Sequence, residues 1–154
     1  MKDIDVLGLG VSTIDILNVV DHFPLEEEVQ RSIETAIDGG GPVATAIVAL
    51  ARLGAKVMMI DSIGDNWCGK LILGEFKREN VLTDHIKVNK GCTSSTATIL
   101  VRKNDGARTI IYSPGNAPEV LENEITPELI SKAKYIHING RHLSACFKAC
   151  MIAK

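Results

Sequence analysis

The segment Asp38-Gly-Gly-Gly-Pro42 limits the possible folds more than any other stretch of this chain. Glycine loses more backbone freedom on folding than other residues, and proline has no backbone N–H to donate. Three glycines followed by proline are therefore not expected inside a regular helix or strand. We predict a tight connection here, where a ligand could approach the bare backbone and bind to its free N–H groups.

The elements around this connection alternate between strand and helix. Asp5 to Leu9 predicts a buried strand. Ala44 to Leu53 is rich in alanine and leucine, which predicts a helix that is buried on most of its surface and has Gly54 as its C′ residue. Val57 to Ile60 then predicts a second buried strand, and Lys70 to Glu79 an amphipathic helix. This order favours a parallel sheet with right-handed crossovers and helices on its faces.

Other segments predict a separate, smaller sheet. Those near 14–20 and 30–37 have strand-like patterns that contain polar residues. Thr93 to Val101 alternates hydroxyl and aliphatic side chains, Asn104-Asp-Gly106 signals a turn, and Thr109 to Tyr112 returns as a strand. We expect the hairpin to be inserted into the α/β pattern and to form, with the first two segments, a sheet that projects from the main one.

The C-terminal part of the chain predicts one more strand and two helices. Thr126 is suited to be an N-cap, with Pro127 at the first helical position. Tyr135 to Ile138 predicts a short strand that ends at Gly140, and Leu143 to Ala153 predicts a helix. The chain therefore stops within the pattern of a βαβ unit.

Composition excludes several classes of partner. The 154 residues are 45% hydrophobic and 23% charged, as in one soluble domain, and the net charge of −2 provides no basic field for nucleic acid. The longest apolar region, Val43 to Ile60, is interrupted by charged residues and is not a membrane span. The N-terminus does not have the layout of a signal peptide. We expect a cytoplasmic protein with neither nucleic acid nor membrane as a partner.

Two further patterns allow alternatives. Gly8-Leu-Gly10 begins like a dinucleotide-binding fingerprint, but Thr13 stands where the third glycine belongs. Cys146 and Cys150 are four residues apart and have histidines nearby, which makes a zinc site conceivable. Spacing alone is weak evidence for zinc, and small apolar residues packed in a helix explain the cysteines more simply. We predict no metal site, and we keep a small dinucleotide-binding domain as an alternative.

Asp15 is the carboxylate with the clearest chemical potential. It lies within an apolar run, where a carboxylate is costly unless hydrogen bonds satisfy it. One carboxylate can accept from two hydroxyls of a sugar, and the glycines from Gly39 to Gly41 would admit the ligand beside the N-terminus of the next helix. Alternatively, Asp15 caps a turn and the glycines form a tight connection. The residues alone do not separate these interpretations.

Several stretches together resemble the N-terminal signature of the PfkB, or ribokinase-like, carbohydrate kinases. They are Gly40-Gly41-Pro42-Val43-Ala44-Thr45, Ala51-Arg-Leu-Gly54, Gly64-Asp65 and Gly69. Nine residues separate Gly54 from Gly64, as they do in the family pattern. Asp15 matches the family's early sugar-binding aspartate, and the hairpin at 93–112 matches its lid. Ala107 to Ile110 and Ile136 to Arg141 are similar to ketohexokinases, and Gly39 to Ala46 is similar to sulfofructose kinases.

The resemblance implies a fold, an activity and a site. It implies the N-terminal half of a ribokinase-like α/β fold over residues 1–154, a parallel sheet flanked by helices, with lid strands near 14–37 and 93–112. The complete enzyme would transfer the γ-phosphate of ATP, with Mg²⁺, to a hydroxyl of a ketose-like sugar. Six residues are implied to bind the sugar or line the mouth of its site: Asp15, Gly40, Gly41, Thr45, Arg108 and Asn139. Dimerisation through lid strands is a further expectation.

This chain departs from the family pattern at two site positions and in length. Thr45 stands where the family usually has asparagine, and Asn139 where ketohexokinase-like enzymes have an acidic residue, so the identity of the sugar is open. Family members are about twice as long, and their second half carries Gly-Ala-Gly-Asp, whose aspartate is the catalytic base. No such stretch occurs here. We therefore expect no catalytic residue in this chain and no turnover by it alone. A non-catalytic sugar-binding or regulatory half-kinase is the other alternative.

Overall fold

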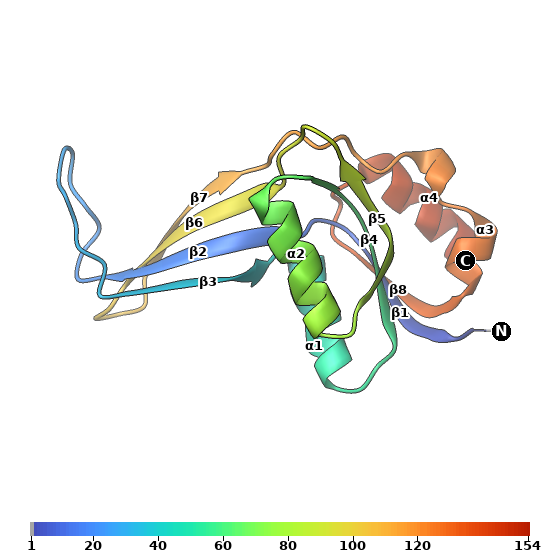
Figure 1. Cartoon of the computed structure of the whole chain (residues 1–154). Helices are drawn as coiled ribbons and strands as arrows, with labels where there is room; N and C mark the ends of the chain where they lie inside the picture. The colour runs from blue at the N-terminus through green and yellow to red at the C-terminus, as the bar shows by residue number, and fades with distance from the viewer. Residues whose placement is uncertain (1) are drawn as a thin grey trace.

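A computed structural model describes residues 2–154 as two four-stranded sheets with helices on both faces of one of them (Figure 1). The main sheet is parallel, in the order β5 (Leu82–Asn89), β4 (Val57–Gly64), β1 (Ile4–Leu9), β8 (Ala133–Ile138). The second has the order β3 (Glu34–Gly40), β2 (Thr13–Val20), β6 (Ser95–Arg102), β7 (Arg108–Ser113). We call this second sheet the lid sheet.

The helices are short and lie beside the main sheet. They are α1 (Pro42–Arg52), α2 (Trp67–Arg78), the 3₁₀ turn η1 (Glu122–Glu124), α3 (Pro127–Ser131) and α4 (Leu143–Ala153). None of the helices in the described part of the chain is both long and apolar enough to cross a membrane. The α/β fold with a small projecting sheet, predicted from the sequence, is therefore confirmed.

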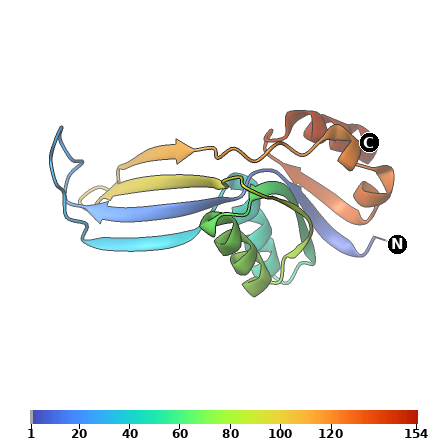
Figure 2. The same ribbon diagram turned by 45° about the horizontal axis from the view of Figure 1, so that its top comes forward.

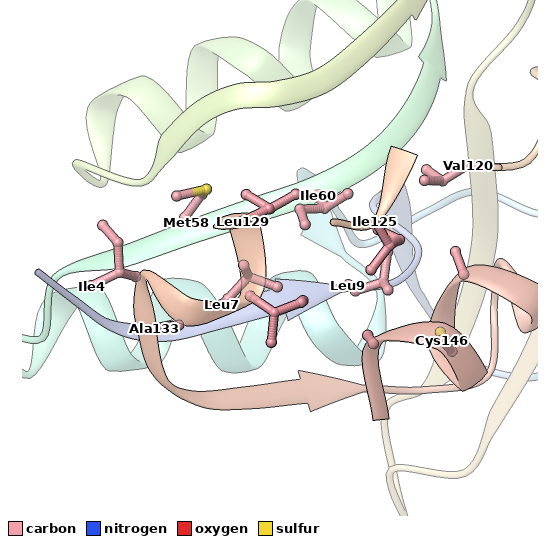
Figure 3. Packing of buried hydrophobic residues seen from close by; sticks show 13 residues of the cluster. Ile4, Leu7, Leu9, Met58, Ile60, Val120, Ile125, Leu129, Ala133 and Cys146 are labelled. Atoms are coloured by element: carbon pink, nitrogen blue, oxygen red, sulfur yellow. The ribbon is translucent and has the colours of Figure 1, made fainter. Parts of the chain in front are cut away.

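The main sheet has a hydrophobic cluster on each face. Successive side chains of a strand point to opposite faces, so Leu7 and Leu9 lie on one side of β1, while Val6 lies on the other. The first cluster is covered by α3 and α4, and Figure 3 shows Leu7 and Leu9 beside Ile125, Leu129 and Cys146. The second cluster is covered by α1 and α2. Burial on both faces explains the apolar run from Val57 to Ile60 in the first half of β4.

The lid sheet runs outward from the end of the main sheet (Figures 1 and 2). The chain leaves β1, makes a short turn and enters β2, which pairs antiparallel with β3 and parallel with β6. The hairpin of β6 and β7 completes the sheet, with Thr98 opposite Ile111. Because β2 follows β1 directly, the lid sheet is joined to the edge where the parallel strands of the main sheet end.

One prediction about the glycine segment is wrong. Gly39 and Gly40 are the last residues of β3, in register with Ile14 and Thr13 of β2, and only Gly41 leaves the strand, with φ at 98°. The strand also begins later than expected, at Glu34. Glycine is tolerated in this strand because other chain segments approach it closely, as the site shows below.

Other boundaries also differ from the sequence-based expectations. The strand β5 was not predicted, because its half-exposed edge position gives it few apolar residues. The helix α2 begins at Trp67, three residues earlier than expected, since Asn66 Oδ1 caps it by accepting from the N–H of Gly69. The helix α1 is buried along one stripe and not over most of its surface. In contrast, α4 has its predicted bounds.

Candidate functional site

The candidate site lies where β1 ends and β2 begins. In open α/β folds, ligands bind at the carboxyl edge of the parallel strands. Asp15 is half-buried in β2, and its Oδ1 accepts a hydrogen bond of 2.7 Å from Thr13 Oγ1. Among the described residues this is the only hydrogen bond to the Asp15 carboxylate, so Oδ2 retains its capacity to accept from a ligand.

Gly40 and Gly41 are required by close contacts around this carboxylate. A Cβ atom on Gly40 would collide with the carboxylate of Asp15, and a Cβ atom on Gly41 would collide with the carbonyl oxygen of Val11. The φ of 98° at Gly41 is also one that residues with side chains rarely adopt. Gly41 is the N-cap of α1, and the first N–H groups of that helix are free to bind an oxygen atom or an anion.

Thr45 and Asn139 flank this position from two other elements. Thr45 lies in the first turn of α1, where its backbone N–H donates to Gly41 O at 2.9 Å, and its side chain is exposed. Asn139 is the exposed residue directly after β8, and its Oδ1 accepts from the N–H of Arg141 at 3.2 Å. A Cβ atom on Gly10 would collide with Asn139, so Asn139 is held beside the end of β1.

Arg108 lies further out on the lid sheet. It pairs with Val101, which in turn pairs with Val19, so Arg108 is level with a residue four positions beyond Asp15. At about 3.3 Å per residue, this is a displacement of about 13 Å along the strands. The side chain of Arg108 is exposed. The structure therefore brings Asp15, Gly40 and Gly41 together, places Thr45 and Asn139 beside them, and keeps Arg108 apart.

Sequence reasoning missed a buried polar pair next to the site. His142 is fully buried and Asp61 almost so, and His142 Nε2 lies 2.8 Å from Asp61 Oδ1. The N–H of Val120 donates to His142 Nδ1 at 3.2 Å. Because Nδ1 accepts, the proton of the neutral ring is on Nε2, which donates to Asp61. One sequence feature could have pointed to this pair: the carboxylate of Asp61 directly follows the apolar run from Val57 to Ile60.

Asp61 also holds the turn that leads to Asp15. Its Oδ2 accepts from the backbone N–H of Ser12 at 2.7 Å, and its Oδ1 accepts from the N–H of Ser62 at 2.7 Å. This buried carboxylate therefore joins three parts of the chain: the β1–β2 turn, the end of β4 and the start of α4. Hydrogen bonds to an ionised acceptor are among the stronger ones in proteins, so this node stabilises the position of the candidate site.

Comparison with known proteins gives the family. Residues 1–153 match the sequence profile described as pfkB family carbohydrate kinase. The chain belongs to the pfkB family.

Relatives within the pfkB family include mouse ketohexokinase and an Arabidopsis thaliana protein named probable fructokinase-2. The first is 26% identical over 94% of this chain and 48% of its own length, and the second is 30% identical over 97% and 48%. The crystal structure of a putative ribokinase from Agrobacterium tumefaciens superposes with a TM-score of 0.85 at 23% identity, over 97% of this chain and 48% of that chain, which shows the shared fold. The chain spans about half the length of the curated relatives that it matches.

The family assignment excludes the alternative of a small dinucleotide-binding domain. The structure gives another reason for the two glycines that suggested it, Gly8 and Gly10. A Cβ atom on Gly8 would lie against Ile47 of α1, and one on Gly10 would lie against Val43. These glycines therefore allow α1 to pack closely on β1.

The structure also uses the groups that suggested zinc for other purposes. Cys146 Sγ donates to Arg141 O at 3.0 Å, and burial raises the pKa of its thiol. Within residues 2–154, no three His, Cys, Asp or Glu side chains are arranged to hold a metal ion.

Proposed function

We propose that this pfkB-family chain is the sugar-binding half of an ATP-dependent carbohydrate kinase. The observation that carries the proposal is the carboxylate of Asp15, which has an acceptor oxygen available and lies against Gly40 at the N-terminus of α1. This group is at the carboxyl edge of a parallel sheet, and a projecting lid sheet is joined to the same edge. The complete enzyme would move the γ-phosphate of ATP to a hydroxyl of a ketose-like sugar.

The roles of the site residues follow from their chemistry. Asp15 accepts from two neighbouring hydroxyls of the sugar, which fixes its position and orientation. Gly40 and Gly41 bring the backbone close to the sugar ring. Thr45 supplies one hydroxyl, whereas the asparagine usual at this position in the family would supply both a carbonyl oxygen and an amide N–H₂ group. Asn139 contacts the sugar from the end of β8. Arg108 contributes if the lid sheet bends toward the main sheet when the sugar binds.

ATP and Mg²⁺ are assigned to the part of the enzyme that corresponds to the second half of its relatives. The described residues do not bring three side chains of the types that ligate metal ions together. Because the Gly-Ala-Gly-Asp stretch of the family pattern does not occur in this sequence, we assign no catalytic base to this chain, and we place the ligands of Mg²⁺ in the second half of the enzyme. Its own contribution is to bind the sugar, to orient the accepting hydroxyl and to exclude water with the lid sheet.

We further propose that two copies associate through their lid sheets in the cytoplasm. The strand β7 is an edge strand, and its Ile110, Ile111 and Tyr112 are each at least half exposed. Such an edge offers unpaired backbone groups and apolar side chains to a second copy.

Calorimetric titration of the complete enzyme with a panel of ketoses and aldoses tests the proposed function. We expect one sugar class to bind, and Asp15→Ala to abolish useful affinity because two charge-assisted hydrogen bonds, each of about 1.5–3 kcal/mol, are lost. Affinity for ATP should stay the same.

Asp21→Ala, which changes an exposed carboxylate at the far end of β2, is the matched control and should bind sugar normally. Unchanged sugar affinity in Asp15→Ala would remove Asp15 from the site. Sugar binding without phosphate transfer by the complete protein would favour a non-catalytic binding protein.

A further inference from the structure

A groove between α1, α2 and the end of β3 lies next to the candidate sugar site. Its volume is about 500 Å³, which is large enough for a small molecule. Apolar side chains from both helices form its walls: Ala44, Val48, Ala49, Ile72 and Phe76. Six polar residues also line it: Ser12, Thr13, Asp38, Thr45, Arg52 and Glu75. An apolar hollow with a few convergent polar groups is the usual form of a ligand site.

This groove is separate from the position of the Asp15 carboxylate. A Cβ atom on Gly40 would point at Asp15, whereas a Cβ atom on Gly39 would point at the carboxylate of Glu75 in α2. The end of β3 therefore has Asp15 against Gly40 and Glu75 against Gly39, while Asp38, which pairs with Asp15 of β2, lines the groove at the edge of the lid sheet. Asp15 itself does not line the groove. The two sites thus share a wall, formed by Gly40 and the start of α1.

Two arginines, Arg52 and Arg78, lie near the carboxylates of the groove, but among the described residues neither donates a hydrogen bond to Glu75 or Asp38. The side chain of Glu75 is 15% exposed, and the cation nearest to it is Arg78 Nη2 at 3.8 Å. Burial, followed by the negative charge of Asp38, raises the pKa of Glu75. Arg52 also lines the groove, but its guanidinium is held by Glu79 in two hydrogen bonds of 2.8 and 2.7 Å. A positive group placed between Asp38 and Glu75 would relieve their repulsion.

A second observation points to a ligand. Ser12 lines the groove and is 2% exposed, and its Oγ is the one buried side-chain oxygen or nitrogen in residues 2–154 without a hydrogen-bond partner. Buried hydroxyls in native proteins almost always have a partner, which can be a bound molecule. The Oγ atom can both donate and accept.

We propose that this groove is a second ligand site, which binds a small molecule with an apolar body and one ammonium group. The ammonium lies between Asp38 and Glu75, and the apolar body contacts Val48 and Phe76. Ser12 Oγ hydrogen-bonds a polar atom at the inner end of the ligand. Since β3 continues outward into the lid sheet, a molecule bound here also ties the lid sheet to α2. The sugar and ATP play no part in this binding.

Ligand-observed NMR on the 154-residue chain tests this site, because the method tolerates association of the protein. Cyclohexylamine, which is positively charged at neutral pH, is the probe, and cyclohexanol is its neutral match. We expect cyclohexylamine to bind at least about tenfold more tightly than cyclohexanol, which corresponds to one charge-assisted hydrogen bond. Glu75→Gln and Asp38→Asn should each remove most of this difference.

Two more variants complete the experiment. Ala49→Phe fills the groove from an exposed helix position and should abolish binding of both probes. Glu122→Gln neutralises an exposed carboxylate of η1, which packs with α4 on the opposite side of the main sheet, and should bind like the unchanged chain. Equal binding of amine and alcohol, no binding of the amine, or undiminished binding in Ala49→Phe would each overturn the proposal. None of these results bears on sugar binding, so the proposed function is tested separately.

Discussion

At the residue scale, the candidate site depends on close approaches that only particular side chains permit. Gly40 is the clearest case, because a Cβ atom placed on it would collide with the carboxylate of Asp15. We predict that Gly40→Ala in the complete enzyme weakens sugar binding by about tenfold or more, because the new methyl group displaces Asp15 by a distance that matters for a hydrogen bond. Calorimetric titration with the sugar measures the effect.

Gly54→Ala is the control for that substitution. Gly54 has a positive φ, of 88°, but no atom lies within 4 Å of a Cβ placed on it, and it is remote from Asp15. This variant should lose some stability and keep its sugar affinity. Similar losses of affinity in both variants would mean that Gly40 acts through stability alone.

The buried pair of Asp61 and His142 leads to a second prediction at this scale. In His142→Ala, the carboxylate of Asp61 loses a donor and the buried N–H of Val120 loses its acceptor. We expect the free energy of unfolding to fall by at least about 2 kcal/mol, since each buried group left unsatisfied costs about 1–3 kcal/mol. Urea unfolding of the chain measures this change. His137→Ala, at an exposed position on β8, should change it by less than about 0.5 kcal/mol.

At the scale of elements, short helices depend on their caps. The helix α3 is only five residues long, and Thr126 Oγ1 caps it by accepting from the N–H of Leu129 at 3.3 Å. We predict that Thr126→Ala lowers the free energy of unfolding by about 1 kcal/mol, as is typical for the loss of an N-cap. Thr126→Ser keeps the hydroxyl and should restore most of the stability in the same urea experiment. Equal losses in both variants would show that the methyl group matters and the cap does not.

At the scale of the whole molecule, the main sheet has two edge strands, β5 and β8, and the edge at β8 is accompanied by exposed apolar side chains. Tyr135 on this edge strand is 71% exposed. On the neighbouring helix α4, Phe147 is 64% and Met151 is 72% exposed. We expect these 154 residues alone to associate in solution, because unpaired strand edges and apolar patches favour contacts between chains. Light scattering as a function of concentration measures association, and Phe147→Glu together with Met151→Lys should reduce it.

The same preparation tests the absence of turnover. We predict no ATP-dependent phosphorylation of any ketose by these 154 residues with Mg²⁺ present. An active, monomeric preparation would contradict both the predicted association and the assignment of the catalytic base to the second half of the enzyme.

Features that depend on neighbours along the chain could be predicted from the amino-acid sequence. The cap at Thr126, the positive φ at Gly54 and the bounds of α4 follow from local propensities and from apolar spacing, and all three are present in the structure. The lid hairpin was also predictable, because strand alternation and turn residues are local signals. Asp15 was found as a candidate because a carboxylate in an apolar run is unusual, and its role as a sugar ligand stays a prediction.

Features whose partners are distant in the sequence could not be predicted and became visible in the folded chain. Gly39 belongs to a strand because it pairs with Ile14 of β2, and a side chain there would collide with Glu75 of α2. Asp61 is satisfied by His142, which is 81 residues away. The level of Arg108 on the lid sheet depends on the register of three strands. No local pattern encodes such pairings, since they arise when hydrophobic burial brings separate segments together and each buried polar group must then find a partner.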